Sequence, residues 1–294
     1  MEHGEIKVTL LGTGTPGPSI DRFGPSTLVE ANGQRFVFDC GRGAIQRLAQ
    51  IGVPLNEVDT LFLTHLHSDH VVGIPDLWLT GWVFGRREPF RVWGPEGTAR
   101  MMSHLEEAFQ YDIHVRRDLD EKFPARGIEV AVSEIQEGVV YEQDGVRITA
   151  FDVDHRPIVP ALGFRIDYGG RAVVLSGDTR YSENLVGFAQ GADLLVHEVV
   201  APKAVQARRR AAGRDDETTQ RIVDHHTTPQ QAGEIFSQVG PKLAVYSHIV
   251  SGPGGEPEIL EGTRQAYAGL FEIGVDLMTF HVGETVRVGR PGEG

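Results

Sequence analysis

One short segment, Thr64–His70, constrains this chain more than any other, because it holds three histidines and an aspartate. The preceding residues 59–64 are mostly apolar and predict a short buried strand, so the donors begin where that strand ends. Two histidines separated by one leucine point the same way from an extended backbone. The aspartate and the last histidine follow on the loop and can face a second point nearby. This pattern is typical of a metal site rather than a solvated loop. The four donors are His65, His67, Asp69 and His70.

Three further residues are each the first strongly coordinating side chain after a predicted strand. Loops at such positions carry chemistry on a rigid scaffold. His155 follows residues 146–153, Asp178 follows residues 172–177, and His248 follows residues 243–247. Each of them alone is equally consistent with an ordinary residue at a strand end. Together with the first segment they complete the roughly six or seven donors that two metal ions need.

With these residues the chain resembles the metallo-β-lactamase-fold hydrolases, and within them the branch of ribonuclease Z and the arylsulfatase-like proteins. The resemblance covers nearly the whole chain. Its metal motif is specific to the superfamily but not to a substrate. The matching segments are His65-x-His67-x-Asp69-His70, His155, Ser176-Gly177-Asp178-Thr179-Arg180 and His248, together with Leu10–Pro16, Phe38–Gly41, His197-Glu198 and His226-Thr227-Thr228.

The resemblance implies a dinuclear centre with two Zn²⁺ per chain. Imidazole and carboxylate donors suit zinc and would also accept Mn²⁺, Fe²⁺ or cobalt. Two such ions lower the pKa of a shared water and stabilise a displacement at phosphorus, sulfur or a carbonyl carbon. By the resemblance, the first ion is expected to bind His65, His67 and His155, and the second ion Asp69, His70 and His248. Asp178 is expected to bridge the two ions.

Three residues are candidates for a catalytic part beyond metal binding. Asp69 is a candidate acceptor for the proton of the attacking water. By the resemblance, His226 is paired with Glu198. A carboxylate behind an imidazole raises its pKa and fixes its tautomer, so that it can protonate a leaving oxygen. From the residues alone, His226 is equally consistent with an ordinary loop residue before a helix, and the adjacent His225 competes with it.

We expect an α/β fold in a single domain, residues 1–294, arranged as the four-layer αββα sandwich that the resemblance implies. At 294 residues and 40% hydrophobic content, the chain can bury one large core. The least regular stretches are 111–145 and 203–226, and the second resembles an insertion. Strands are predicted at 6–11, 26–31, 35–39, 59–64, 90–93, 128–134, 146–153, 161–167, 171–176, 192–196, 242–247, 276–281 and 284–288. Helices are predicted at 43–51, 75–84, 96–110, 182–190, 201–212, 229–239 and 256–271.

The composition indicates a cytoplasmic protein without a membrane segment. The N-terminal residues are polar and acidic, which predicts no signal peptide, and no stretch approaches the roughly 18 apolar residues of a membrane span. The single cysteine, Cys40, excludes an internal disulfide.

Residues 12–17 match the glycine spacing of a dinucleotide-binding loop. Pro16 and Pro18 disfavour the helix that such a loop needs, so we expect no nucleotide cofactor.

The formal net charge of −13 argues against a nucleic-acid partner, because phosphate contacts by basic side chains supply most of that affinity. Local basic runs exist. One of them, Arg208–Arg210 with Arg214, is followed at once by Asp215–Glu217, which we expect to neutralise it. Such runs are usually solvated helix faces. The expected partner is therefore a small-molecule ester.

The main functional prediction is a metal-dependent hydrolase of small phosphodiesters or aryl sulfate-like esters. The alternative is a tRNA 3′-processing endonuclease like ribonuclease Z. Common bacterial ribonuclease Z proteins carry a long tRNA-gripping arm between the third metal histidine and the bridging aspartate. Here His155 and Asp178 are only 23 positions apart, too few for that arm. Hydrolysis of β-lactams or lactones is a further alternative. A non-catalytic metal-binding module is the last, and the complete donor set argues against it.

We also expect a homodimer, because members of this branch are often dimers. The apolar residues suggested for the contact belong to the helix predicted after the metal segment, and they are Trp78, Leu79, Trp82, Val83 and Phe84. The spacing of the two tryptophans is usual for a stripe that faces a core or a subunit contact. The tryptophans could instead form a wall of the substrate pocket.

Overall fold

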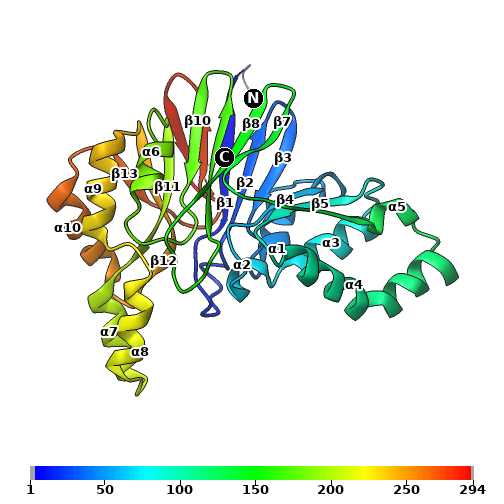
Figure 1. Ribbon diagram of the computed structural model, residues 1–294, viewed down its shortest axis with the longest axis horizontal. Coiled ribbons are helices and arrows are strands. Elements are labelled where there is room, and N and C mark those ends of the chain that lie inside the picture. The colour runs from blue at the N-terminus through cyan, green and yellow to red at the C-terminus, as the bar shows by residue number, and fades with distance from the viewer. Residues whose placement is uncertain (1–3, 293–294) are drawn as a thin grey trace.

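The computed structural model describes residues 4–292 as two β-sheets packed face to face, with helices on both outer faces (Figure 1). This is the predicted α/β, four-layer αββα sandwich. The first sheet has eight strands in the order β15-β14-β1-β2-β3-β4-β5-β6, with the bounds β1 Ile6–Gly12, β2 Ser26–Ala31, β3 Gln34–Phe38, β4 Thr60–Phe62, β5 Phe90–Gly94, β6 Val130–Glu134, β14 Thr279–Val282 and β15 Val286–Gly289. The second sheet has seven strands in the order β13-β12-β11-β10-β9-β8-β7, with the bounds β7 Gly138–Gln143, β8 Val146–Asp152, β9 Leu162–Tyr168, β10 Arg171–Leu175, β11 Leu194–Val200, β12 Leu243–Val250 and β13 Phe271–Ile273.

The helices divide between the two outer faces. On the side of the first sheet lie α1 Ala44–Gln50, η1 Leu55–Glu57, α2 Ser68–Val71, α3 Ile74–Val83, α4 Thr98–His114, η2 Val115–Leu119 and α5 Ala125–Ile128. On the side of the second sheet lie α6 Glu183–Phe188, α7 Pro202–Ala211, α8 Asp216–Asp224, α9 Pro229–Val239 and α10 Gly255–Ala266. Within residues 4–292, no helix has both the length and the apolar character required to cross a membrane.

The central core lies between the sheets, and the strand sequences account for it. In β8, Val146, Ile148 and Ala150 point into this core, while Arg147 between them is exposed, as expected for a strand with one buried face. Strand β11 is buried along its whole length, because it pairs in parallel with β10 and β12 and is covered by helices on its outer face. Separate apolar clusters join each helical layer to its sheet.

Trp78 and Trp82 belong to the core between α3 and the first sheet. Both side chains are fully buried, and their indole N–H groups donate hydrogen bonds to the carbonyl oxygens of Ile128 and Pro124. The suggestion that these tryptophans form a subunit contact or a pocket wall is therefore wrong, because neither has surface to offer. Phe84, which directly follows this helix, is 65% exposed. The homodimer itself stays a prediction.

Two differences from the predicted elements lie in the stretches expected to be irregular, and a third lies in the helix predicted at 256–271, which ends at Ala266 and is followed by strand β13 from Phe271. Strand β7 falls within residues 111–145. It was missed because it is an edge strand in which only Tyr141 is buried, so its apolar residues do not alternate clearly. Residues 203–226 form most of an ordered helical hairpin, α7 and α8, which projects from the body of the molecule in Figure 1. Asp69 and His70, expected on a loop, lie in the one-turn helix α2.

Candidate metal centre

The predicted metal donors converge where strands of both sheets end. β3, β4 and β5 pair in parallel in the first sheet, as do β10, β11 and β12 in the second. The carboxyl ends of parallel strands form the usual ligand-binding edge of such sheets. His248 lies within β12 at φ +48°, where the pairing between β11 and β12 shifts register. A left-handed conformation at a residue other than glycine is costly and is found preferentially at functional sites.

The first donor group consists of His65, His67, His155 and Asp178, whose donor atoms all lie within 4.8 Å of one another. Nε2 of His65 is 2.9 Å from Nδ1 of His67, which is 3.3 Å from Nε2 of His155. In a tetrahedral zinc site with Zn–N bonds of about 2.0–2.1 Å, ligand nitrogens lie about 3.4 Å apart. Three nitrogens from the ends of two strands, β4 and β8, thus have nearly the spacing that a shared metal ion imposes.

The second donor group consists of Asp69, His70 and His248, again within 4.8 Å. Oδ2 of Asp69 is 3.4 Å from Nε2 of His248 and 3.9 Å from Nε2 of His70. Asp178 joins the two groups, because its Oδ2 is 3.3 Å from Nε2 of His70 and 3.8 Å from Nε2 of His65. The arrangement is that of a binuclear metal site with one shared carboxylate.

Unpaired buried atoms test whether metal ions fit this site. Nε2 of His70, Oδ1 of Asp178 and Nδ1 of His248 are buried without a hydrogen-bond partner among the described residues. Buried polar atoms are almost always paired, and an orphaned one costs about 1–3 kcal/mol. Metal coordination would satisfy atoms of this kind in both halves of the site. The residues present therefore fit two metal ions.

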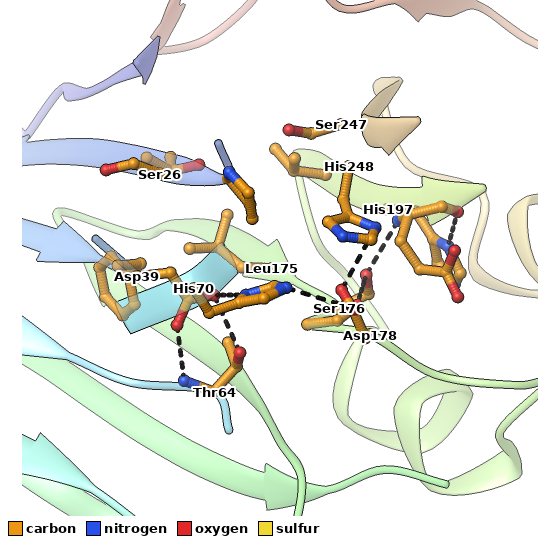
Figure 2. A pocket seen from close by; sticks show the side chains of 16 residues that line it. Ser26, Asp39, Thr64, His70, Leu175, Ser176, Asp178, His197, Ser247 and His248 are labelled. Carbon is orange, nitrogen blue, oxygen red and sulfur yellow. Dashed lines mark hydrogen bonds and ion pairs between the residues drawn. The ribbon is translucent and has the colours of Figure 1, made fainter. Parts of the chain in front are cut away.

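A second layer of contacts orients the histidine rings. Oδ2 of Asp39 lies 2.8 Å from Nδ1 of His70 and accepts the Thr64 hydroxyl at 2.8 Å, which leaves the other nitrogen of His70 facing Asp178 (Figure 2). His155 is held in the same way, with its Nδ1 2.9 Å from the carbonyl oxygen of His225. Partners of this kind fix the tautomer of a ligand histidine.

The sequence reasoning did not assign Asp39 a role. A signal was available, because Asp39 is the first polar residue after a buried strand. The donors of the second sheet, His155, Asp178 and His248, were predicted from the same position relative to a strand.

Electrostatics keep most of these groups in the forms that bind metals. Burial lowers the pKa of His65 well below its ordinary value and that of His155 to about 4, so both imidazoles are neutral. Burial alone would raise the pKa of Asp178, but His248 and His70 outweigh it and hold that pKa well below its usual range. His70 differs, because Asp178 and Asp39 outweigh burial and raise its pKa.

His226 and Glu198 meet beside the metal donors. Nδ1 of His226 is 3.2 Å from Oε1 of Glu198, and both residues are buried. Burial would lower the pKa of His226, but the charge of Glu198 outweighs it and raises that pKa. His225 is half-buried, its pKa is lowered by burial to about 4, and it contributes its carbonyl oxygen to His155. The structure thus pairs Glu198 with His226 rather than with its neighbour.

The site opens into a cleft of about 610 Å³ between the strand ends and the α7–α8 hairpin. Its floor includes His67, Asp69, Asp178, His226 and His248. A cleft with metal donors on its floor and a histidine–carboxylate pair at its side can hydrolyse a bound ester or diester.

Fold and site together define a metal-dependent hydrolase built on an αββα sandwich. Residues 34–249 match the Beta-lactamase superfamily domain. Ribonuclease Z of Mycolicibacterium gilvum is 40% identical over 281 residues, which cover 92% of this chain and 94% of that protein. The chain belongs to the metallo-β-lactamase-fold superfamily, in its ribonuclease Z branch.

Solved structures share the same fold. The metallo-β-lactamase-fold protein YhfI of Bacillus subtilis has a TM-score of 0.71 at 20% identity, and the match covers 94% of this chain and 99% of that one. The short form of human tRNase Z has a TM-score of 0.67 at 22% identity, with coverage of 93% and 98%.

These relatives correct the prediction about partners. A small-molecule ester was expected and nucleic acid was argued against, yet a relative that matches almost the whole chain is named ribonuclease Z. The prediction was wrong because it relied on net charge, which sums over the whole surface. Phosphate binding depends on the charges that line one site.

Proposed function

We propose that this protein is a tRNA 3′-processing endonuclease, which cleaves a phosphodiester bond at the 3′ end of the tRNA part of a precursor. The observation that carries this proposal is the 40% identity to a ribonuclease Z across 92% of the chain. The segment between His155 and Asp178 is too short for the tRNA-gripping arm, so the proposal requires that another surface of the protein binds the RNA.

We propose that zinc is the native metal, with Mn²⁺ or Fe²⁺ as alternatives, because the donors are imidazoles and carboxylates. When bound, the two ions would lower the pKa of a water and stabilise the negative charge that develops on the phosphoryl oxygens. The proposed ligands are the seven donors of the two groups, His65, His67, Asp69, His70, His155, Asp178 and His248.

We assign to His226 the protonation of the oxygen that leaves when the phosphodiester bond breaks. Its Nδ1 faces Glu198 at 3.2 Å, so Nε2 is the ring atom left to hold a proton for the leaving oxygen. Oε1 of Glu198 also accepts the backbone N–H groups of Thr179 and Thr227, at 3.2 and 2.9 Å. One carboxylate therefore orients the imidazole and ties together the two loops that carry Asp178 and His226.

The test compares two substrates with the zinc-loaded protein: a precursor tRNA that bears a 3′ trailer, and bis(4-nitrophenyl) phosphate. We expect a single cut at the 3′ end of the tRNA and a higher kcat/KM for the precursor than for the diester. Chelator-treated protein and an Asp178→Ala variant serve as inactive controls. Hydrolysis of the diester without any cut in the precursor would contradict the proposal.

A further inference from the structure

The α7–α8 hairpin forms one wall of the metal-site cleft. Arg208, Arg209 and Arg214 line the cleft together with the metal donors on its floor. Figure 1 shows the hairpin extending from the second sheet side, beyond the edge where the strands end. The hairpin is ordered by its own contacts, because Nε of Arg209 donates to the Thr219 hydroxyl at 2.8 Å across the two helices.

The acidic residues that follow the basic run do not neutralise this wall. Asp215 accepts the backbone N–H of Thr218 at 2.6 Å and so caps α8. Asp216 pairs with Arg210 at 2.7 Å. The expected neutralisation by Asp215 and Asp216 therefore reaches only Arg210.

Glu217 is also engaged elsewhere, because it pairs with Arg221 at 3.2 Å. Arg208 and Arg214 are exposed, and neither makes a side-chain hydrogen bond or ion pair with any residue from 4 to 292. Two uncompensated guanidinium groups thus stand beside the catalytic floor of a protein whose net charge is −13.

We propose that Arg208 and Arg214 bind phosphates of the RNA backbone that flank the scissile bond. This inference rests on the proposed function. Guanidinium groups suit this task, because they stay charged and match the geometry of phosphate oxygens in pairs. A protein that is acidic overall can bind RNA in this way, because screening limits the reach of distant charges to about 8 Å at physiological salt.

The lining of a neighbouring cavity indicates that the ligand is a strand rather than a single diester. Arg208 also lines a second cavity of about 630 Å³, and Thr15 and Gly17 border both cavities. Arg22 lines the second cavity with Glu256, and its Nη1 donates hydrogen bonds to the Thr13 hydroxyl at 2.7 Å and the Gly274 carbonyl oxygen at 2.6 Å. Basic side chains therefore line both adjoining cavities, which favours a ligand longer than a single diester.

The test uses the zinc-loaded Arg208→Glu/Arg214→Glu double variant with precursor tRNA and bis(4-nitrophenyl) phosphate. We expect kcat/KM for the precursor to fall about 10- to 100-fold, since a hydrogen bond to a charged group contributes about that much. We expect hydrolysis of the diester to change less than twofold. The dependence of log(kcat/KM) on log[salt] should flatten by about 0.7–0.9 for each lost phosphate contact.

Arg210→Glu is the control, because it reverses one charge on α7, the helix that carries Arg208, at a residue that does not line the cleft. We expect it to cleave the precursor like the wild type. A double variant that cleaves the precursor with unchanged kcat/KM and salt dependence would overturn the inference and leave the proposed function intact. Equal losses on both substrates would overturn it too, because the arginines would then act on the metal centre. A wild-type protein that fails to cut the precursor overturns the proposed function itself.

Discussion

Asp39→Asn tests whether the second layer of contacts sets the metal affinity. Asp39 has φ +57°, a conformation that asparagine tolerates as well as aspartate, so the backbone is not strained by the change. Oδ1 accepts the Thr64 N–H at 2.9 Å, and the asparagine oxygen can keep that bond. The new amide NH₂ then faces Nδ1 of His70, where a carboxylate oxygen stood 2.8 Å away. His70 must accept at Nδ1, which moves its proton to Nε2, the nitrogen that faces Asp178.

We expect the affinity for zinc to fall about 10- to 100-fold, the usual effect of losing such a partner. This corresponds to about 1.4–2.7 kcal/mol of binding free energy. The assay is competition with a chromophoric chelator, and activity should return when free zinc is raised. Asp193→Asn is the control, because Asp193 is also buried and accepts the Ala172 N–H at 2.9 Å, outside both donor groups. An Asp39→Asn protein with unchanged zinc affinity would refute the reasoning.

Three further predictions concern the bridge, the proton donor and the core. Asp178→Ala should lower the bound metal per chain, measured by atomic emission, and abolish activity. Full activity of this variant after chelator treatment would contradict the assignment of Asp178 to the metal site. Glu198→Gln keeps an acceptor for the backbone but removes the charge behind His226. It should lower kcat about 100-fold or more with metal content unchanged, and an effect on KM alone would argue against the assigned role. Trp78→Ala should cost about 3–5 kcal/mol in urea unfolding, while Phe84→Ala, at an exposed side chain, should stay within about 0.5 kcal/mol. Similar costs for both would contradict the assignment of Trp78 to the core.

The error about nucleic acid shows how far charge arguments reach. Net charge is a property of composition, and at physiological salt only charges within about 8 Å of a phosphate matter strongly. The sequence placed Arg208–Arg210 next to Asp215–Glu217, so the two runs seemed to cancel. The hairpin separates them, because Asp215 caps a helix and Asp216 pairs with Arg210 on the exposed side.

The sequence by itself predicted most strands and helices and the set of candidate donors, while the four-layer arrangement came from the family resemblance. Strand and helix periodicity are local properties, and donors that come first after buried strands are visible without a fold. Strand β7 and helix α8 were missed, whereas α7 corresponds to the helix predicted at 201–212. In β7 most residues are exposed or half-buried, which weakens the apolar alternation that a strand prediction needs.

Only the tertiary structure decided which distant residues act together. It placed Asp39 behind His70, 31 positions away, and Glu198 behind His226 rather than His225. It also turned Arg208 toward the cleft while Arg210 pairs outside it. These outcomes depend on how strand ends from two sheets meet and on which way a helix faces, and neither is encoded in the spacing of residues along the chain.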